Sequence, residues 1–200
     1  LTPLLGRPVT AANDADCFAL AEALRGAGQG HRTVFGVILG TGVGGGIIWK
    51  GQILEGIGGV SGEWGHGPVI GERRVGTRIV PAIRCGCGIV GCVDAVGSAR
   101  GMEKLDAALH PAMPHRDSRA IVAAWLAREG KATETIDLYL DGLAGPLARG
   151  LNATGASMVP VGGGLSNVPE LLRALDERVR AGILRRTNAP ILRQATLGPE

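Results

Sequence analysis

Three of the four cysteines in this 200-residue chain lie within one short segment, RCGCGIVGC. They are Cys85, Cys87 and Cys92, and the glycines between them allow a backbone path tight enough for three sulfurs to converge. An odd number of thiols is a poor basis for disulfides, whereas three thiolates and one imidazole nitrogen form a tetrahedral structural zinc site. His66, in GEWGHGP at the start of the same glycine-rich tract, is the candidate fourth ligand. The sequence therefore predicts zinc bound by His66, Cys85, Cys87 and Cys92.

Two neighbouring features do not extend this metal site. Cys17 falls in a predicted helix and is interpreted as a small core residue. Glu63 and His66 lack the first histidine of a helical zinc-protease motif, and Gly65 disfavours the helix which that motif needs. Glu63 is then either a surface glutamate or a carboxylate that accepts hydrogen bonds from the hydroxyl groups of a ligand.

Two glycine runs follow predicted strands. LGTGVGGGII contains G-x-G-x-x-G from Gly40 to Gly45, but a β-branched segment follows where a dinucleotide-binding fold needs a helix. Such a turn can present backbone N–H groups and the Thr41 hydroxyl to phosphate oxygens, although a plain tight hairpin explains the same residues. The second run, residues 162–164 in VPVGGGLS, leaves room for a flat base or a ribose to approach the backbone.

The string NDAD, residues 13 to 16, has two interpretations. Asn13 can cap a helix whose first turn is acidic, which is the common role of such a string. A carboxylate at a strand-to-helix junction can also serve as a general base. The string is not a calcium loop, because the other ligand positions are missing.

These motifs are set among strands that alternate with helices, and this alternation predicts an α/β fold. A glycine-rich, weakly periodic tract from Glu55 to Gly97 holds the cysteines, and we expect a metal to order it. The predicted order is a helix from Asn13 to Arg25, a strand over 33–40, a hairpin turning at Lys50 and Gly51, helices from Ala99 to 154, a strand before Gly162, a helix from Val168 and a last strand within 189–197.

Composition excludes several classes of protein. The net charge of +3 comes from scattered arginines, and only 3% of residues are aromatic, so nucleic-acid binding by this segment is not expected. No apolar stretch approaches the roughly 20 residues that a bilayer requires, and the first residues do not resemble a signal peptide. We expect one domain in a cytoplasmic protein. The chain begins without methionine, so we also expect it to be a fragment lacking an amino-terminal part.

In order, NDAD, LGTGVGGG, GEWGH, CGCGIVGCVD and VPVGGGLS resemble the series of motifs that marks the ROK family of sugar kinases and sugar-sensing repressors. The resemblance implies an actin-like ATPase (ribonuclease H-like) fold, with residues 1–200 forming the large carboxy-terminal lobe and a zinc loop within 61–97. It implies a sugar site made by Asn13, Asp14, Glu63 and His66, with Asp14 as catalytic base. It also implies that Gly40, Thr41 and Gly42 lie at the ATP phosphates, and Gly162, Gly163 and Gly164 near adenosine.

Trp64 and the uninterrupted ANDAD are similar to the bacterial fructokinase, glucokinase and N-acetylglucosamine kinase branch of that family. The resemblance implies transfer of phosphate from ATP with magnesium to a hexose or N-acetylhexosamine, at the 6-hydroxyl, by a homo-oligomer. Asp94 stands where the family has a sugar-binding glutamate and is one methylene shorter, and the resemblance makes it a further candidate sugar contact. The alternative is the sugar-sensing lobe of a ROK-type repressor, which does not strictly need both Asp14 and Thr41.

Overall fold

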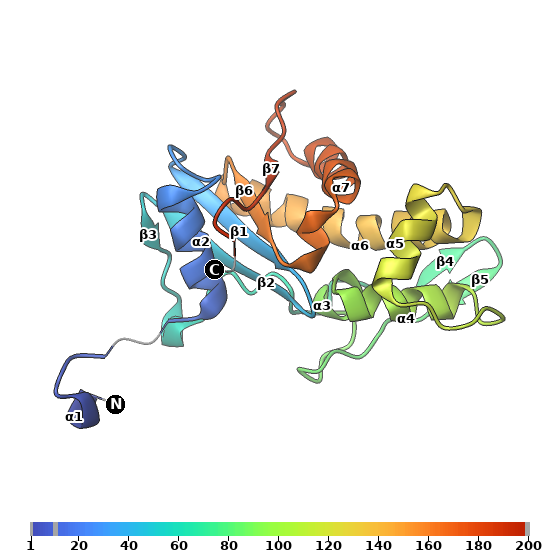
Figure 1. Cartoon of the computed structure of the whole chain (residues 1–200), viewed down its shortest axis with the longest axis horizontal. Helices are drawn as coiled ribbons and strands as arrows, with labels where there is room; N and C mark the ends of the chain where they lie inside the picture. The colour runs from blue at the N-terminus through green and yellow to red at the C-terminus, as the bar shows by residue number, and fades with distance from the viewer. Residues whose placement is uncertain (1, 10–11, 199–200) are drawn as a thin grey trace.

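The computed structural model describes residues 2–9 and 12–198, which form a five-stranded sheet with helices on both faces (Figure 1). In spatial order the strands are β3, β2, β1, β6 and β7. β1 pairs antiparallel with β2 and parallel with β6, which in turn pairs parallel with β7. The strands are β1 (Thr33–Leu39), β2 (Val43–Trp49), β3 (Gln52–Ile53), β6 (Val159–Gly162) and β7 (Leu192–Gln194). The predicted α/β class is confirmed.

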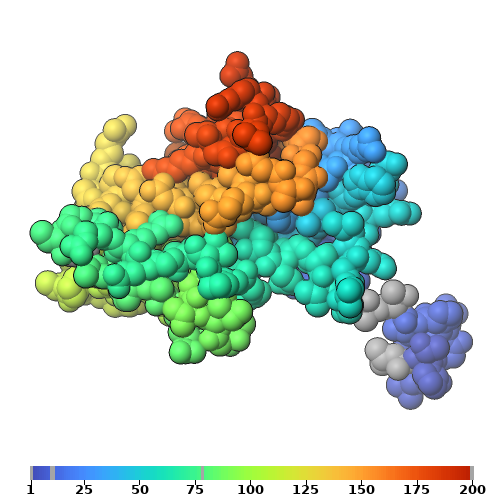
Figure 2. Space-filling model, turned by 180° about the vertical axis from the view of Figure 1, so that it is seen from behind, coloured from blue at the N-terminus to red at the C-terminus, as the bar shows by residue number. Residues whose placement is uncertain are grey.

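Alternation along β1 decides which helix covers which face, because successive side chains of a strand point to opposite sides. Val34 packs in a cluster with Ala19 and Ala23 of α2 (Asp14–Arg25). Phe35 belongs to the large core on the other face, together with residues of α6 (Gly130–Thr154) and α7 (Pro169–Gly182). Seen from behind, α6 and α7 cover that second face (Figure 2).

Glycines in the two central strands let α2 approach the sheet closely. A Cβ on Gly36 would lie 2.5 Å from the Cβ of Ala19, and a Cβ on Gly46 would lie 2.9 Å from the Cα of Asp16. Gly36 and Gly46 are therefore needed for helix-on-sheet packing. This contact places the amino terminus of α2 over the middle of β2.

The helical part of the molecule is built around the first half of α6. Its buried residues Tyr139 and Leu140 join Leu105 and Ile121 in one core. The elements that supply this layer are α3 (Asp94–Gly97), α4 (Ala99–Leu109), α5 (Ser118–Leu126) and the hairpin β4 (Arg73–Val75) and β5 (Arg78–Val80). They lie beside the sheet along α6 (Figure 1).

Most predicted elements are confirmed, and one region differs. The interpretation of Cys17 as a core residue is wrong, because Cys17 lies on the exposed side of α2. Asn13 caps α2 through its side chain, and the hairpin turns at Lys50 and Gly51, both with positive φ. The tract from Glu55 to Gly97 is more regular than expected, because it contains β4, β5 and α3 as well as the short helix η1 (Ile57–Gly59). The remaining short helices are α1 (Thr2–Leu5) and η2 (Gly164–Asn167). Among the described helices, none is both long enough and apolar enough to cross a bilayer.

Candidate active site

The two glycine turns predicted to bind nucleotide lie side by side. β1 and β6 are parallel neighbours, so the turns that follow them, residues 40–42 and 162–164, emerge at the same edge of the sheet. Gly163 has φ 85° and ψ 166°, and a Cβ there would lie 2.4 Å from the carbonyl oxygen of Leu39. Only glycine allows this approach, which brings the backbones of the two turns together.

The turn at 40–42 leaves donors free. Gly40 donates its N–H to the carbonyl of Gly42, at 3.0 Å. Within the described residues, the N–H groups of Thr41 and Gly42 have no acceptor, and the Thr41 side chain is exposed. Free amides on a turn at a sheet edge form an anion-binding arrangement.

Both turns open onto a cleft of about 650 Å³. The cleft has a size typical of a small-molecule site, and its walls combine backbone with apolar side chains. Val122 and Leu126 of α5, one helical turn apart, form one wall, and Leu165 and Val168 contribute to the other. Its polar lining includes Thr41, Ser118, Arg119 and Asn167. An apolar wall facing free amides suits a nucleotide, with the base on the wall and the phosphates at the turn.

The NDAD string caps a helix and leaves one carboxylate exposed beside the cap. The Asn13 side chain accepts a hydrogen bond from the Ala15 N–H at 2.8 Å, so it is a helix cap. Asp14, in the first turn, is exposed, and its Oδ1 also accepts from the Ala15 N–H, at 2.9 Å. Its Oδ2 has no hydrogen-bond partner within residues 2–9 and 12–198. A carboxylate oxygen at the positive end of a helix is thus available to a ligand.

Asp16, the last residue of the string, is buried, and its Oδ1 has no hydrogen-bond partner among the described residues. Burial raises the pKa of this carboxyl above its ordinary value, and the nearby negative charge of Glu63 raises it further. Gly46 of β2 lies against both Asp16 and Gly62, so the NDAD string and the GEWGH segment lie close together.

The GEWGH segment reaches that position by lying along β2. The Trp64 indole N–H donates to the carbonyl of Gly44 at 3.0 Å, and its ring packs edge-on against Phe35 with centroids 6.3 Å apart. A Cβ on Gly45 would lie 2.7 Å from the indole, so the middle glycine of the run accommodates Trp64. Glu63 is exposed beside this anchored tryptophan. Its position is therefore set by the packing of its neighbour.

The structure brings the four predicted metal ligands together. One ligand atom from each of His66, Cys85, Cys87 and Cys92 lies within 4.8 Å of all the others. Cys87 Sγ is 3.6 Å from Cys92 Sγ, and Cys85 Sγ is 3.8 Å from His66 Nδ1. Zinc–sulfur bonds of about 2.3 Å in a tetrahedron require sulfur atoms about 3.8 Å apart, so the residues fit this ion. The segment forms a loop at the lower edge of the molecule (Figure 1).

The thiols of the cluster differ in acidity. A hydrogen bond from the Ile89 N–H is the largest influence on Cys87 and lowers its pKa to about 7. Burial raises the pKa of Cys85 to about 12 and that of Cys92 in the same direction. A bound cation favours the thiolate form, so it would offset the burial of the two inner sulfurs. His66 turns Nδ1 toward the sulfurs, and within the described chain Nε2 has no partner.

The Asp94 side chain contacts the protein through both of its oxygens. Its Oδ1 accepts from the Val43 N–H at 2.7 Å, and its Oδ2 is 3.3 Å from Cys85 Sγ. The aspartate side chain therefore connects the cysteine loop to the start of β2.

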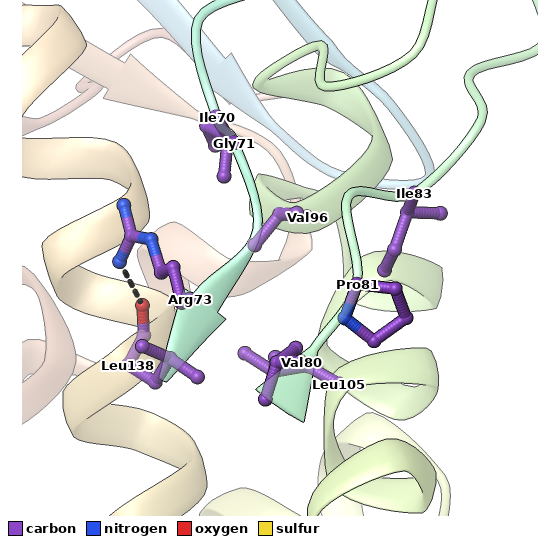
Figure 3. Close-up of a pocket in the computed structure, with 9 residues that line it drawn as sticks. All are labelled: Ile70, Gly71, Arg73, Val80, Pro81, Ile83, Val96, Leu105 and Leu138. Carbon is purple, nitrogen blue, oxygen red and sulfur yellow. Dashed lines mark hydrogen bonds between the residues drawn. The ribbon is translucent and has the colours of Figure 1, made fainter. Parts of the chain in front are cut away.

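A small apolar cavity beneath the same tract is not a ligand site. It has a volume of only about 10 Å³, room for one water at most. Figure 3 shows Val80 beside Leu105 at one end of the cavity and Ile70 at the other, with Arg73 donating to the Leu138 carbonyl at 3.4 Å. This contact fixes the tract on α4 and α6.

Sequence reasoning missed the contribution of α5 to the cleft. Ser118, Arg119, Val122, Ala123 and Leu126 all line it. The available signal was the spacing of Val122 and Leu126, two apolar residues one helical turn apart. Spacing alone could not distinguish this stripe from an ordinary core face.

Comparison with known proteins agrees with this geometry. The family model described as "ROK family" matches residues 1–199. The chain belongs to the ROK family. It is 38% identical over 201 residues to the N-acetyl-D-glucosamine kinase of Yersinia pseudotuberculosis (strain YPIII), covering 99% of this chain and 65% of that protein. It is 36% identical to an N-acetylgalactosamine kinase of Shewanella sp. (strain ANA-3), covering 99% and 63%.

Solved ROK structures share the fold. The ROK hexokinase from Thermus thermophilus superposes with a TM-score of 0.82 at 31% identity, covering 99% of this chain and 63% of that one. The ROK glucokinase from Streptomyces griseus, in complex with glucose and AMPPNP, gives 0.78 at 27% identity, covering 98% and 66%. The chain spans 63–65% of the length of these two curated kinases.

Proposed function

We propose that the protein containing this ROK chain transfers the γ-phosphoryl group of ATP to the 6-hydroxyl of a hexose or N-acetylhexosamine, with N-acetylglucosamine as the first candidate. The observation that carries the proposal is the pair of adjoining glycine turns that opens on a cleft of about 650 Å³. The similarity to N-acetylglucosamine and N-acetylgalactosamine kinases supports the choice of substrate class.

ATP with magnesium occupies the cleft in this proposal. The free N–H groups of Thr41 and Gly42 bind phosphate oxygens, and the apolar wall at Val122 and Leu126 receives the base. Gly162, Gly163 and Gly164 lie near the adenosine. Catalysis of phosphoryl transfer consists chiefly of positioning and charge stabilisation, which fixed backbone amides supply.

The sugar lies between the amino terminus of α2 and the GEWGH segment. Asp14 accepts the proton of the attacking hydroxyl at its free Oδ2, while Asn13 and Glu63 bind other hydroxyls. His66 would hold the metal through Nδ1, which faces Cys85, and would form a hydrogen bond to the sugar through Nε2. The packing of Asp16 and Gly62 against Gly46 supports the closeness of these two segments.

Zinc has a structural role in this proposal. His66, Cys85, Cys87 and Cys92 supply four protein ligands, so no coordination position is left for water. The metal holds the tract that carries Glu63 and His66 in place. It takes no part in the phosphoryl transfer itself.

The test is ADP release by the full-length protein with N-acetylglucosamine, N-acetylgalactosamine, glucose, fructose and mannose, with zinc and magnesium present. We expect turnover with an N-acetylhexosamine. The 6-deoxy analogue of the accepted sugar should compete for binding without releasing ADP. Absence of turnover with every sugar would contradict the proposal, and calorimetric sugar binding without turnover would favour the repressor-lobe alternative.

A further inference from the structure

The nucleotide turn at 40–42 is held from both sides by one short segment, Asp94–Ala99, which we term the α3 clasp. Asp94 Oδ1 accepts from the Val43 N–H at 2.7 Å, directly after the turn. The Ala99 N–H donates to the Gly40 carbonyl at 2.9 Å, at the beginning of the turn. The clasp starts two residues after Cys92, so it connects the cysteine loop directly to the turn.

The clasp itself is anchored. The Asp94 N–H donates to the Gly65 carbonyl at 2.9 Å, next to His66. The fully buried Tyr139 donates its hydroxyl hydrogen to the Gly97 carbonyl at 2.8 Å. A Cβ on Gly97 would lie 2.4 Å from a methyl of Leu143, so the clasp packs tightly on α6. It can shift only together with its surroundings.

The length of the Asp94 side chain matters for this arrangement. Oδ1 lies 3.0 Å from the place where a Cβ of Gly42 would be, so the carboxylate is already against the turn. A glutamate would carry its oxygens about one further C–C bond, about 1.5 Å, into this backbone. A metal-bound thiolate at Cys85 has no proton to donate, so the coupling rests on the two backbone hydrogen bonds of Asp94.

We propose that Asp94 is a positioning residue for the nucleotide turn, and that it transmits the order of the cysteine loop to residues 40–43. This inference rests on the proposed function, because it assigns ATP phosphates to the turn. It differs from a sugar-binding role for the same residue. It also implies that loss of the metal weakens nucleotide binding as well as sugar binding.

Three substitutions in the full-length protein separate the two roles. Asp94→Ala removes the acceptor for the Val43 N–H, Asp94→Asn keeps an oxygen at the same reach without charge, and Asp94→Glu keeps the charge with a longer reach. Asp141→Asn, an exposed aspartate on α6, is the matched control. The measurements are calorimetric affinity for AMPPNP and for the accepted sugar, zinc content, and hydrogen exchange of a peptide covering residues 40–46.

We expect Asp94→Ala to weaken AMPPNP binding about tenfold and to speed exchange of the 40–46 peptide, since a charge-assisted hydrogen bond is lost. Asp94→Asn should restore most of both, and Asp94→Glu should not. Removal of zinc from the wild type by a chelator should speed exchange of the same peptide. Wild-type AMPPNP affinity and exchange in Asp94→Ala, with sugar affinity alone reduced, would overturn the inference. Failure of the wild type to bind AMPPNP would instead refute the proposed function, and this inference with it.

Discussion

Gly163→Ala is expected to damage both the stability of the fold and the nucleotide turn. Gly163 has φ 85° and ψ 166°, a region of backbone space that is essentially restricted to glycine. The added Cβ would lie 2.4 Å from the Leu39 carbonyl oxygen and 3.0 Å from the Gly40 nitrogen. Both contacts are with backbone, so neither can be relieved by rotation of a side chain.

The cost has two parts. Holding alanine in this conformation costs about 1–3 kcal/mol. Overpacking against a rigid neighbour costs roughly 1–3 kcal/mol more. The free energy of unfolding should therefore fall by about 2–6 kcal/mol. If the chain relieves the contact by moving the 40–42 turn, part of this loss appears as weaker nucleotide binding instead.

Urea denaturation measures the loss, and Gly164→Ala is the matched control for stability. Gly164 begins η2, and a Cβ there meets nothing within 4 Å, so alanine should be neutral or stabilise the fold by about 0.4–1 kcal/mol. Calorimetry with AMPPNP compares Gly163→Ala with the wild type. Equal unfolding free energies for the two alanine variants, together with unchanged AMPPNP affinity, would refute the close approach of the two turns.

Three further predictions concern the metal and two buried carboxyls. Cys92→Ser should lose stoichiometric zinc, measured by atomic emission, whereas Cys17→Ser, outside the cluster, should keep one zinc per chain; equal zinc content in both would contradict the ligand set. Arg116→Met should cost about 3–5 kcal/mol at pH 7, because it leaves the buried Asp106 carboxylate without the partner that contacts it at 2.6 and 3.0 Å. Burial raises the pKa of Asp106, but its hydrogen bonds outweigh burial and hold the pKa below the ordinary value. The extra stability of the wild type over Arg116→Met is therefore present above about pH 4 and is lost as pH falls through the folded-state pKa of Asp106. A difference in urea midpoint that does not change with pH would contradict this. Asp16→Asn should be more stable than the wild type at pH 7, because burial, and to a lesser extent the charge of Glu63, raises the pKa of Asp16. The difference should vanish below about pH 4, where the carboxyl is protonated in the folded and the unfolded state. A variant less stable than the wild type at pH 7 would show that the Asp16 charge has a partner.

Local chemistry made some of the site predictable. The clustering of His66 with the three cysteines could be predicted because zinc coordination would fix residue types and number, and His66 was the histidine in the same tract as the cysteines. The cap at Asn13 and the turn at Lys50 and Gly51 are local too, since each depends on neighbours within a few residues. Such features need no knowledge of the tertiary fold.

Features that depend on distant partners could not be predicted. The run Gly44–Gly46 looks uniform in sequence, yet its first and last glycines pack against α2 and its middle glycine packs against Trp64. The strands β4 and β5 have three residues each, and each begins with arginine, so the hairpin has no apolar alternation to detect. The partner of Asp94, Val43, lies 51 positions away, and only the fold brings them together.

The most direct test of the account is the rate of ATP-dependent phosphorylation of N-acetylglucosamine by the full-length wild-type protein and by Asp14→Asn, with Asp141→Asn as control. Sugar and AMPPNP affinities are measured by calorimetry on the same samples. A general base contributes roughly 10²–10⁴-fold, so we predict that Asp14→Asn loses at least a hundredfold in kcat while still binding AMPPNP, and that the control retains its rate. A wild-type rate in Asp14→Asn would contradict the assignment of the reaction to this site.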